Sequence, residues 1–86
     1  MHFLDCPGRI NENELRSWTN EIRKLADHDH DEKVVLRISS SGGSSPTALQ
    51  ILGFLQQIPQ HLTTVGLGKV DSAAITIFLA GDRRLI

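Results

Sequence analysis

The stretch "ISSSGGSSPTALQI", residues 38–51, joins a segment with strand character to a segment with helix character. The run KVVLRI at 33–38 is rich in β-branched residues and predicts a strand buried on both faces. Pro46 suits the first position of a helix that continues to about residue 57, which makes Ser45 the expected N-cap. The glycine pair between them is typical of a tight turn or of a loop whose amide groups bind an anion.

Similar units lie on the amino-terminal side of this stretch. HFL at 2–4 predicts a first strand, and a helix is expected over about 12–26. Asn11 can cap this helix, and Glu14 three residues later completes a pattern close to a capping box. Apolar residues at helical spacing then predict its buried face: Leu15, Trp18, Ile22 and Leu25.

The carboxyl-terminal side continues the alternation. LTTVGLG at 62–68 predicts a third strand, and SAAITIFLA at 72–80 predicts a short, fully buried helix with Gly81 just beyond its end. RRLI at 83–86 has the character of a last strand that has only begun. The order β-α-β-α-β-α-β predicts an α/β fold with a parallel sheet and right-handed βαβ crossovers. We expect one domain over residues 1–86, truncated at its end.

Composition excludes several classes of protein. The net charge of the 86 residues is -1 with no basic patch, which argues against a nucleic-acid partner. No apolar run is long enough to cross a membrane, and the first residues do not resemble a secretory signal. Cys6, the single cysteine, cannot form an internal disulfide, which fits a reducing compartment and a cytoplasmic location.

Two features that could carry chemistry are interpreted as structural. Cys6 has no recognisable helper residue and is interpreted as a structural thiol rather than a nucleophile. The run ADHDHDEK at 26–33 alternates histidine with aspartate but joins a helix to a strand, so a solvated loop is favoured over a metal site. We expect neither a metal ion nor a cofactor.

In a parallel sheet, ligands gather beyond the carboxyl ends of the strands. Two loops, Ser39–Ser45 and Gly68–Asp71, are expected there. The first lacks the lysine of a phosphate-binding P-loop, which weakens a phosphate interpretation. Ser72 follows the second loop, at the first turn of a helix, where it is either an N-cap or a nucleophile beside amide donors.

Taken together, the two loops resemble those of the Clp protease proteolytic subunit family, within the ClpP/crotonase fold. In that family a strand runs into an Asn-Ser-Pro-Gly-Gly-Ser loop, and a later strand leads to Gly-x-x-x-Ser and a buried helix ending in Ala-Gly. The counterparts here are Ile38–Ser44, Gly68–Ser72 and Ala80–Gly81. The resemblance spans nearly all of this chain but only about the first half of the family's domain.

The resemblance implies a serine-type peptidase. It implies that Ser72 is the nucleophile and that the backbone N–H groups of Gly43 and Ala73 form the oxyanion hole. It also implies a homo-oligomer, polypeptide substrates and an ATP-driven unfoldase as partner. Departures are Ser39 for asparagine, Ser41 for proline, Ala73-Ala74 for Met-Gly, and Asp71 beside the serine.

The general base is missing from this pattern. The family's catalytic His and Asp follow the nucleophile, whereas no histidine follows His61. The four histidines are expected at the amino ends of the strands, about 16 to 20 Å from Ser72. Lys69 is a weaker candidate base, since nothing predicts its desolvation. The chain is therefore expected to be nearly inert as an isolated peptidase. The alternatives are a non-catalytic ClpP-like assembly subunit and a crotonase-type acyl-CoA enzyme.

Overall fold

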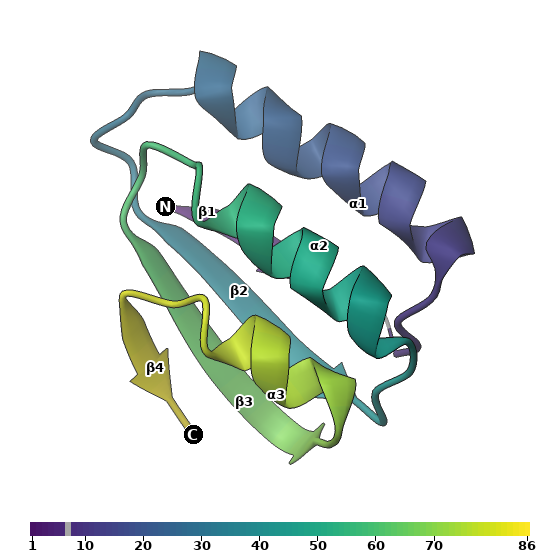
Figure 1. Cartoon of the computed structure of the whole chain (residues 1–86). Helices are drawn as coiled ribbons and strands as arrows, with labels where there is room; N and C mark the ends of the chain where they lie inside the picture. The colour runs from purple at the N-terminus through teal and green to yellow at the C-terminus, as the bar shows by residue number, and fades with distance from the viewer. Residues whose placement is uncertain (7) are drawn as a thin grey trace.

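The structure is a computed structural model that describes residues 1–6 and 8–86. A four-stranded parallel sheet has the strand order β1-β2-β3-β4, the same as the order along the chain. The strands are β1 (His2–Asp5), β2 (Val34–Ser40), β3 (Leu62–Val70) and β4 (Arg83–Leu85). Each of the first three strands is followed by a crossover that returns the chain to the amino-terminal end of the next strand (Figure 1). The predicted alternation and parallel sheet are confirmed.

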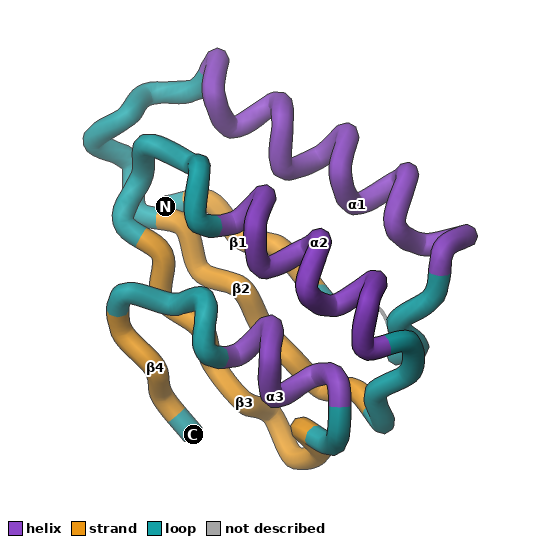
Figure 2. The backbone as a smooth tube through the Cα atoms, viewed as in Figure 1, coloured by secondary structure: helices purple, strands orange, loops and turns teal. Residues whose placement is uncertain are grey.

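Three helices make these crossovers, and all of them lie on one face of the sheet (Figure 2). They are α1 (Glu12–Lys24), α2 (Ser45–Leu55) and α3 (Ala73–Phe78), and a 3-10 turn, η1 (Leu25–Asp27), continues α1. Among the described residues, no helix combines the length and the apolar character needed to cross a bilayer. The molecule therefore has two layers, a sheet and one row of helices.

The first helix begins as its sequence predicts. The Asn11 side chain accepts a hydrogen bond of 3.0 Å from the Glu14 amide, which satisfies one of the amide groups left free at a helix start. Acidic residues occupy its first turn and basic residues its last, as the helix dipole favours. Of the predicted stripe, Trp18, Ile22 and Leu25 are buried, and Leu15 packs at the edge of the core.

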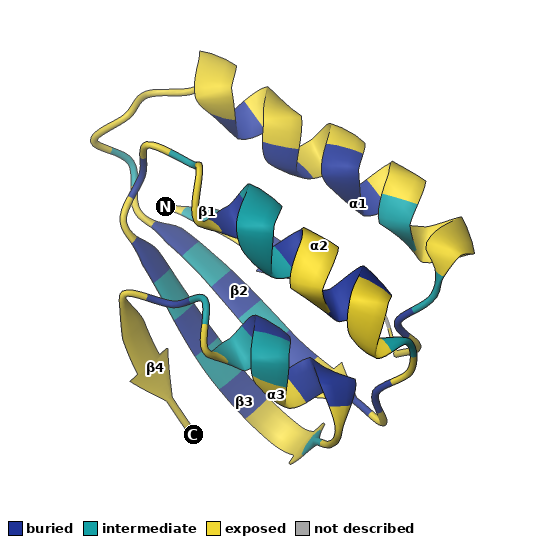
Figure 3. Ribbon diagram, in the orientation of Figure 1, coloured by how far each residue is buried: buried dark blue, intermediate teal, exposed yellow. Residues whose placement is uncertain are grey.

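The core lies between the sheet and the helices. Along β2, Val34, Leu36 and Ile38 point into it and are each 0% exposed. Val35 and Arg37 alternate with them on the other face and are only partly buried (Figure 3). The prediction that this strand is buried on both faces is wrong for this chain, because all three helices cover the same side of the sheet.

Helix α3 is also less buried than its apolar sequence predicts. Ala73, Ala74 and Ile77 face the core, whereas Ile75 and Leu79 are 48% and 53% exposed. The expected helix is confirmed, but the expectation of complete burial is wrong. Gly81 is not in the left-handed conformation of a C′ residue. It is required instead by close packing, because a side chain there would overlap the hydroxyl of Thr64.

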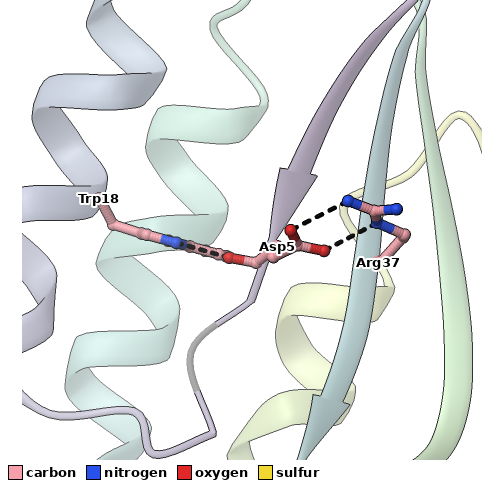
Figure 4. A network of polar contacts seen from close by, with 3 residues as sticks. All are labelled: Asp5, Trp18 and Arg37. Carbon is pink, nitrogen blue, oxygen red and sulfur yellow. Dashed lines mark hydrogen bonds and ion pairs between the residues drawn. The ribbon is translucent and has the colours of Figure 1, made fainter.

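Asp5, the last residue of the edge strand β1, bonds to both neighbouring elements, α1 and β2 (Figure 4). Its carbonyl accepts a 2.9 Å hydrogen bond from the Trp18 indole on α1. Its carboxylate forms a two-bonded ion pair with Arg37, its register partner on β2, at 2.7 and 3.0 Å. These contacts fix the end of β1, and with it the start of the segment that leads to α1.

Candidate functional site

Two turns meet at the carboxyl ends of β2 and β3. The first contains Gly42, and the second contains Asp71 and Ser72. A Cβ atom on Gly42 would lie 2.8 Å from the Asp71 carbonyl oxygen and 2.9 Å from the Ser72 Cβ atom, so only glycine fits. The amide of Asp71 also donates to the Ser40 carbonyl at 3.1 Å. The two predicted loops are therefore in direct contact.

Ser72 has a strained backbone. Its φ of 53° and ψ of -122° make it the only described residue other than glycine with a positive φ. Such a conformation costs about 1–3 kcal/mol in proteins and is concentrated at functional sites. A serine strained in this way between a strand and a helix projects its hydroxyl out of the fold.

The hydroxyl of Ser72 is not used for structure. Ser72 is exposed, and its side chain makes no hydrogen bond in the part of the chain that the structure describes. It precedes α3 as the N-cap residue by position, but it does not cap the helix with its side chain. The interpretation of Ser72 as a simple capping serine is therefore not supported by the geometry.

The neighbouring backbone explains how the strain is held. The Ala74 amide donates to the Asp71 carbonyl at 3.0 Å, and the Ile75 amide donates to the Ser72 carbonyl at 3.0 Å. Ala73 and Ala74 are 3% and 0% exposed. Because both side chains are small, the start of α3 packs closely against the sheet, and the turn cannot relax without losing that burial.

The two predicted oxyanion donors lie beside this serine. The Ala73 amide directly follows Ser72, and Gly43 directly follows the glycine that touches it. Within residues 1–6 and 8–86, neither the Gly43 N–H nor the Ala73 N–H donates to any acceptor. The Ala73 amide is free because it begins α3, and Gly43 is exposed. Two such donors beside an exposed hydroxyl form a candidate oxyanion-binding site.

Two local predictions at this edge are corrected. Gly68, Lys69 and Val70 belong to β3 rather than to a loop, because the register shifts after Ile38 and Ser40 then pairs with Val70. The N-cap of α2 is Ser44, not Ser45: its hydroxyl accepts the Thr47 amide at 3.2 Å. Ser44 takes this role because its own amide donates to the Ile10 carbonyl at 2.8 Å, which holds it in extended conformation.

The charged residues near Ser72 pair with each other. Lys69 and Asp71 form an ion pair of 3.8 Å, and their side chains are 63% and 55% exposed. Lys69 makes no hydrogen bond to Ser72 among the described residues. The weaker hypothesis of a Ser-Lys pair thus finds no support, and the Asp71 carboxylate is occupied by Lys69.

The histidines lie at the amino-terminal ends of the strands, opposite the end where Ser72 lies. His2 begins β1, His28 and His30 belong to the loop before β2, and His61 directly precedes β3. The His2 and His28 rings pack against each other with centroids 5.1 Å apart. The predicted placement at the amino ends is confirmed, so no imidazole of this chain lies beside Ser72.

Cys6 follows β1 at the same edge as Ser72 but is buried, at 9% exposed. Burial raises the pKa of the Cys6 thiol to about 12, because a thiolate is poorly solvated there. Since the thiolate is the reactive form, Cys6 is suppressed as a nucleophile at neutral pH. The interpretation of Cys6 as a structural thiol agrees with this environment.

A cavity of about 380 Å³ opens next to the second turn. Its walls are mainly apolar and come from the end of β3, from α3 and from the last residue. The lining residues are Gly66, Gly68, Val70, Asp71, Ile75, Phe78 and Ile86. Because Asp71 directly precedes Ser72, the cavity is close enough to accept a group attached to a molecule bound at the serine.

Sequence reasoning missed three participants in this arrangement. Gly42 packs against Ser72, the Ser40 hydroxyl binds the Gly42 amide, and Ile10 forms an isolated bridge with Gly43. The Gly-Gly pair could have indicated the close approach at Gly42. Nothing in the local pattern around Ile10 indicates its contact with a loop more than thirty residues away.

Comparisons with known proteins identify the family of the chain. The family model for Clp protease matches residues 3–85. The ATP-dependent Clp protease proteolytic subunit 2 of Thermobifida fusca (strain YX) is 33% identical over 63 residues, which cover 73% of this chain and 31% of that protein.

Solved structures give the same result. ClpP1 from Listeria monocytogenes has a TM-score of 0.85 and 28% identity, over 92% of this chain and 46% of that one. The ClpP protease catalytic domain from Plasmodium falciparum has a TM-score of 0.86 and 25% identity, over 94% and 46%. The chain thus spans less than half the length of these relatives. Since the family model covers nearly every residue, the chain belongs to the Clp protease family.

Proposed function

We propose that this chain supplies the nucleophile and the oxyanion hole of a Clp-type serine peptidase. Ser72 is the nucleophile, and the N–H groups of Gly43 and Ala73 bind the oxyanion that forms when its hydroxyl attacks a peptide carbonyl. The observation that carries the proposal is the backbone of Ser72. Its φ is 53°, the residue is exposed, and its hydroxyl makes no hydrogen bond among the described residues.

The general base is proposed to come from outside these 86 residues. The four histidines begin strands or precede them, at the edge of the sheet opposite Ser72. A base must come within about 3 Å of the hydroxyl proton, which none of them can do across a strand. We therefore expect the isolated chain to hydrolyse peptides very slowly, although it carries the proposed nucleophile and the proposed donors.

The strained serine favours this function over the alternatives. A crotonase-type acyl-CoA enzyme would use two similar amide donors but would gain nothing from a strained, exposed hydroxyl. A non-catalytic subunit would likewise have no use for strain at Ser72. The apolar cavity before Asp71 supports a peptide substrate, because it can take one side chain next to the attacked bond.

Assembly, partners and location follow the family in this proposal. We propose a homo-oligomer in the cytoplasm that receives polypeptides from an ATP-driven unfoldase. The sheet face without helices supports self-association, since Phe3 and Leu85 on β1 and β4 are 50% and 41% exposed. A solution mass well above 9.5 kDa would support assembly, and a monomer at high concentration would oppose it.

The proposed chemistry is tested by labelling with a fluorophosphonate in the presence of imidazole, which supplies the missing base. Peptide mass spectrometry identifies the modified residue among the chain's serines. We expect an adduct on Ser72 in the folded chain, no adduct at this position in Ser72→Ala, and no selective labelling in urea.

Ser39→Ala is the matched control, because Ser39 is an exposed serine near the same edge. It should label at Ser72 as fast as the wild type. If the wild type gives no Ser72 adduct at any imidazole concentration, or if all serines react equally, the peptidase proposal fails. The non-catalytic subunit then becomes the better description.

A further inference from the structure

Hydrogen bonds tie the described residues after β1 to the end of β2 and to the glycine loop, and a further bond joins Ser40 to Gly42. The Ile10 amide donates to the Gly42 carbonyl at 3.0 Å, and the Ser44 amide donates to the Ile10 carbonyl at 2.8 Å. The Ser40 hydroxyl donates to the Gly8 carbonyl at 3.1 Å and accepts the Gly42 amide at 3.0 Å. Ile10 and Ser40 are 1% and 2% exposed, and the bond from the Gly42 amide to the Ser40 hydroxyl is buried, so water competes little for the bonds that hold Gly42.

These bonds determine where the Gly43 N–H points. The Gly42 carbonyl and the Gly43 N–H belong to one planar trans peptide and therefore point in opposite directions. Because the carbonyl is bound to the Ile10 amide, the N–H faces away from Ile10 and remains without an acceptor in the described chain. A flip of this peptide would break the Ile10 bond and replace the free donor with a carbonyl oxygen.

Ser40 holds the other side of the same glycine. A hydroxyl can donate and accept at once, and Ser40 uses both capacities, toward Gly8 and Gly42. Gly42 has φ +96°, and a glycine can adopt other backbone conformations at little energetic cost unless its neighbours restrain it. With its N–H bound to Ser40 and its C=O bound to Ile10, Gly42 is held at both ends, and the following peptide cannot turn freely.

We infer that Ser40 is a positioning residue for oxyanion binding: with the Ile10 amide, its hydroxyl holds the Gly42–Gly43 peptide so that the Gly43 N–H is presented to the substrate. The role in oxyanion binding rests on the proposed function. The fixed orientation of the Gly42–Gly43 peptide rests only on the hydrogen bonds described above. Gly8 and Ile10 thereby become part of the site through their bonds to Ser40 and to the glycine loop.

The first measurement reports on the Gly42–Gly43 peptide group and requires no reaction at Ser72. Amide hydrogen exchange and chemical shifts are recorded by ¹⁵N NMR for the wild type, Ser40→Ala, Ser40→Thr and the control Ser39→Ala. In Ser40→Ala we expect the Gly42 amide to exchange at least about tenfold faster, since its buried acceptor is lost. The Gly43 amide signal should also move. Ser40→Thr keeps the hydroxyl and should restore protection, and Ser39→Ala should match the wild type.

The second measurement is the rate of Ser72 labelling with fluorophosphonate and imidazole, separated into a binding constant and a maximal rate. Loss of one oxyanion donor typically costs about 10²–10³ in rate. We expect a drop of about 10- to 100-fold in the maximal rate for Ser40→Ala with little change in binding, measured where all variants are folded by circular dichroism. Ser40→Thr should recover most of this rate.

The outcomes separate the two proposals. If Gly42 exchange and the Gly43 signal are the same in Ser40→Ala and the wild type, the positioning inference is overturned whether or not Ser72 reacts. It is also overturned if Ser40→Ala labels Ser72 at the wild-type rate. If the wild type gives no Ser72 adduct while Ser40→Ala loses Gly42 protection, the held peptide stands and the proposed function fails.

Discussion

At the carboxyl ends of β2 and β3, described residues reach positive φ and the Gly43 and Ala73 amides are free, whereas in the amino-end loops no described residue has a positive φ and several polar groups bond within their own loop, although the buried Oε1 of Gln60 has no partner among the described residues. The described residues with positive φ all lie at the carboxyl edge: Gly42, Gly43, Gly68 and Ser72. At the amino edge, His30 bonds to the Ala26 carbonyl at 3.0 Å, and the Asp29 carboxylate accepts the Asp31 amide at 2.9 Å.

This difference indicates which edge carries a function. His30 and Asp29 bond within their own loop at the amino ends of the strands, so these two residues are adequately explained as surface residues. At the carboxyl ends, the strained backbone of Ser72 costs stability, and its hydroxyl makes no hydrogen bond among the described residues that would offset this cost. Stability that is given up locally, beside a cavity, is expected where a substrate binds.

Gly43→Ala has the largest predicted effect, and it tests whether the two ends of the sheet differ as described. The new Cβ atom would overlap the Ile10 carbonyl, and Gly43 has φ +149°, which is unfavourable for alanine. We expect the free energy of unfolding, measured by urea denaturation, to fall by about 3 kcal/mol or more.

Gly53→Ala is the control for this substitution. Gly53 lies in α2, and a Cβ atom added to it would have no neighbouring atom within 4 Å, so alanine should stabilise the helix by up to about 1 kcal/mol. Equal stability of the two variants would mean that the glycine loop is not closely packed against Ile10, and the contrast between the two edges would disappear.

A smaller effect, of opposite sign, is expected for Ser72→Gly. Glycine tolerates φ 53° and ψ -122°, so the substitution should raise the free energy of unfolding by about 1–2 kcal/mol while it abolishes labelling at this position. Ser39→Gly, within β2, should instead lower stability by about 0.5–1 kcal/mol. A loss of stability in Ser72→Gly would show that the serine is not strained.

The next effect concerns Cys6 and is confined to alkaline pH. Burial raises the pKa of its thiol from 9.0 to about 12. Between these values the unfolded chain releases the thiol proton and the folded chain keeps it, so the stability of the fold decreases as pH rises from about 9 to 12. Urea denaturation across this range should show a steeper decrease for the wild type than for Cys6→Ala. Parallel curves would mean that Cys6 is accessible at this edge.

The smallest effect is expected at the amino edge. His61→Gln should change the rate of Ser72 labelling in imidazole by less than about twofold, because His61 precedes β3 and Ser72 follows it. The same assay without imidazole should also be unaffected. A decrease of more than about tenfold would place this imidazole near Ser72 and would invalidate the assignment of chemistry to one edge.

Much of the fold could be predicted because its signals are local. The Asn11 cap, the apolar spacing of α1 and the β-branched run of β2 each act within one element, and the structure contains all three. The incorrect predictions concern how far β2 and α3 are covered by other elements. Whether β2 is buried on one face or two, and whether α3 is fully buried, depends on where other elements pack, which periodicity within an element cannot report.

The candidate site divides in the same way. Its position at a helix start indicated Ser72 as a candidate, the family resemblance added Gly43 and Ala73, and the strand order placed both turns at the carboxyl ends of the strands. Ser44 replaced Ser45 as the cap of α2 because Ile10 binds the Ser44 amide, a contact between residues distant in sequence. Ser40 was not recognised as a buried link between Gly8 and Gly42 for the same reason.

By itself, the sequence determined the order of strands and helices, a glycine pair after one strand and a serine after the next. Those features follow from residue type and from spacing along the chain. Only the tertiary structure decided that Gly42 touches the Ser72 turn and that Ile10 orients the Gly43 amide. The physical reason is that the direction of a peptide group is set by its hydrogen-bond partners, and here those partners come from elsewhere in the chain.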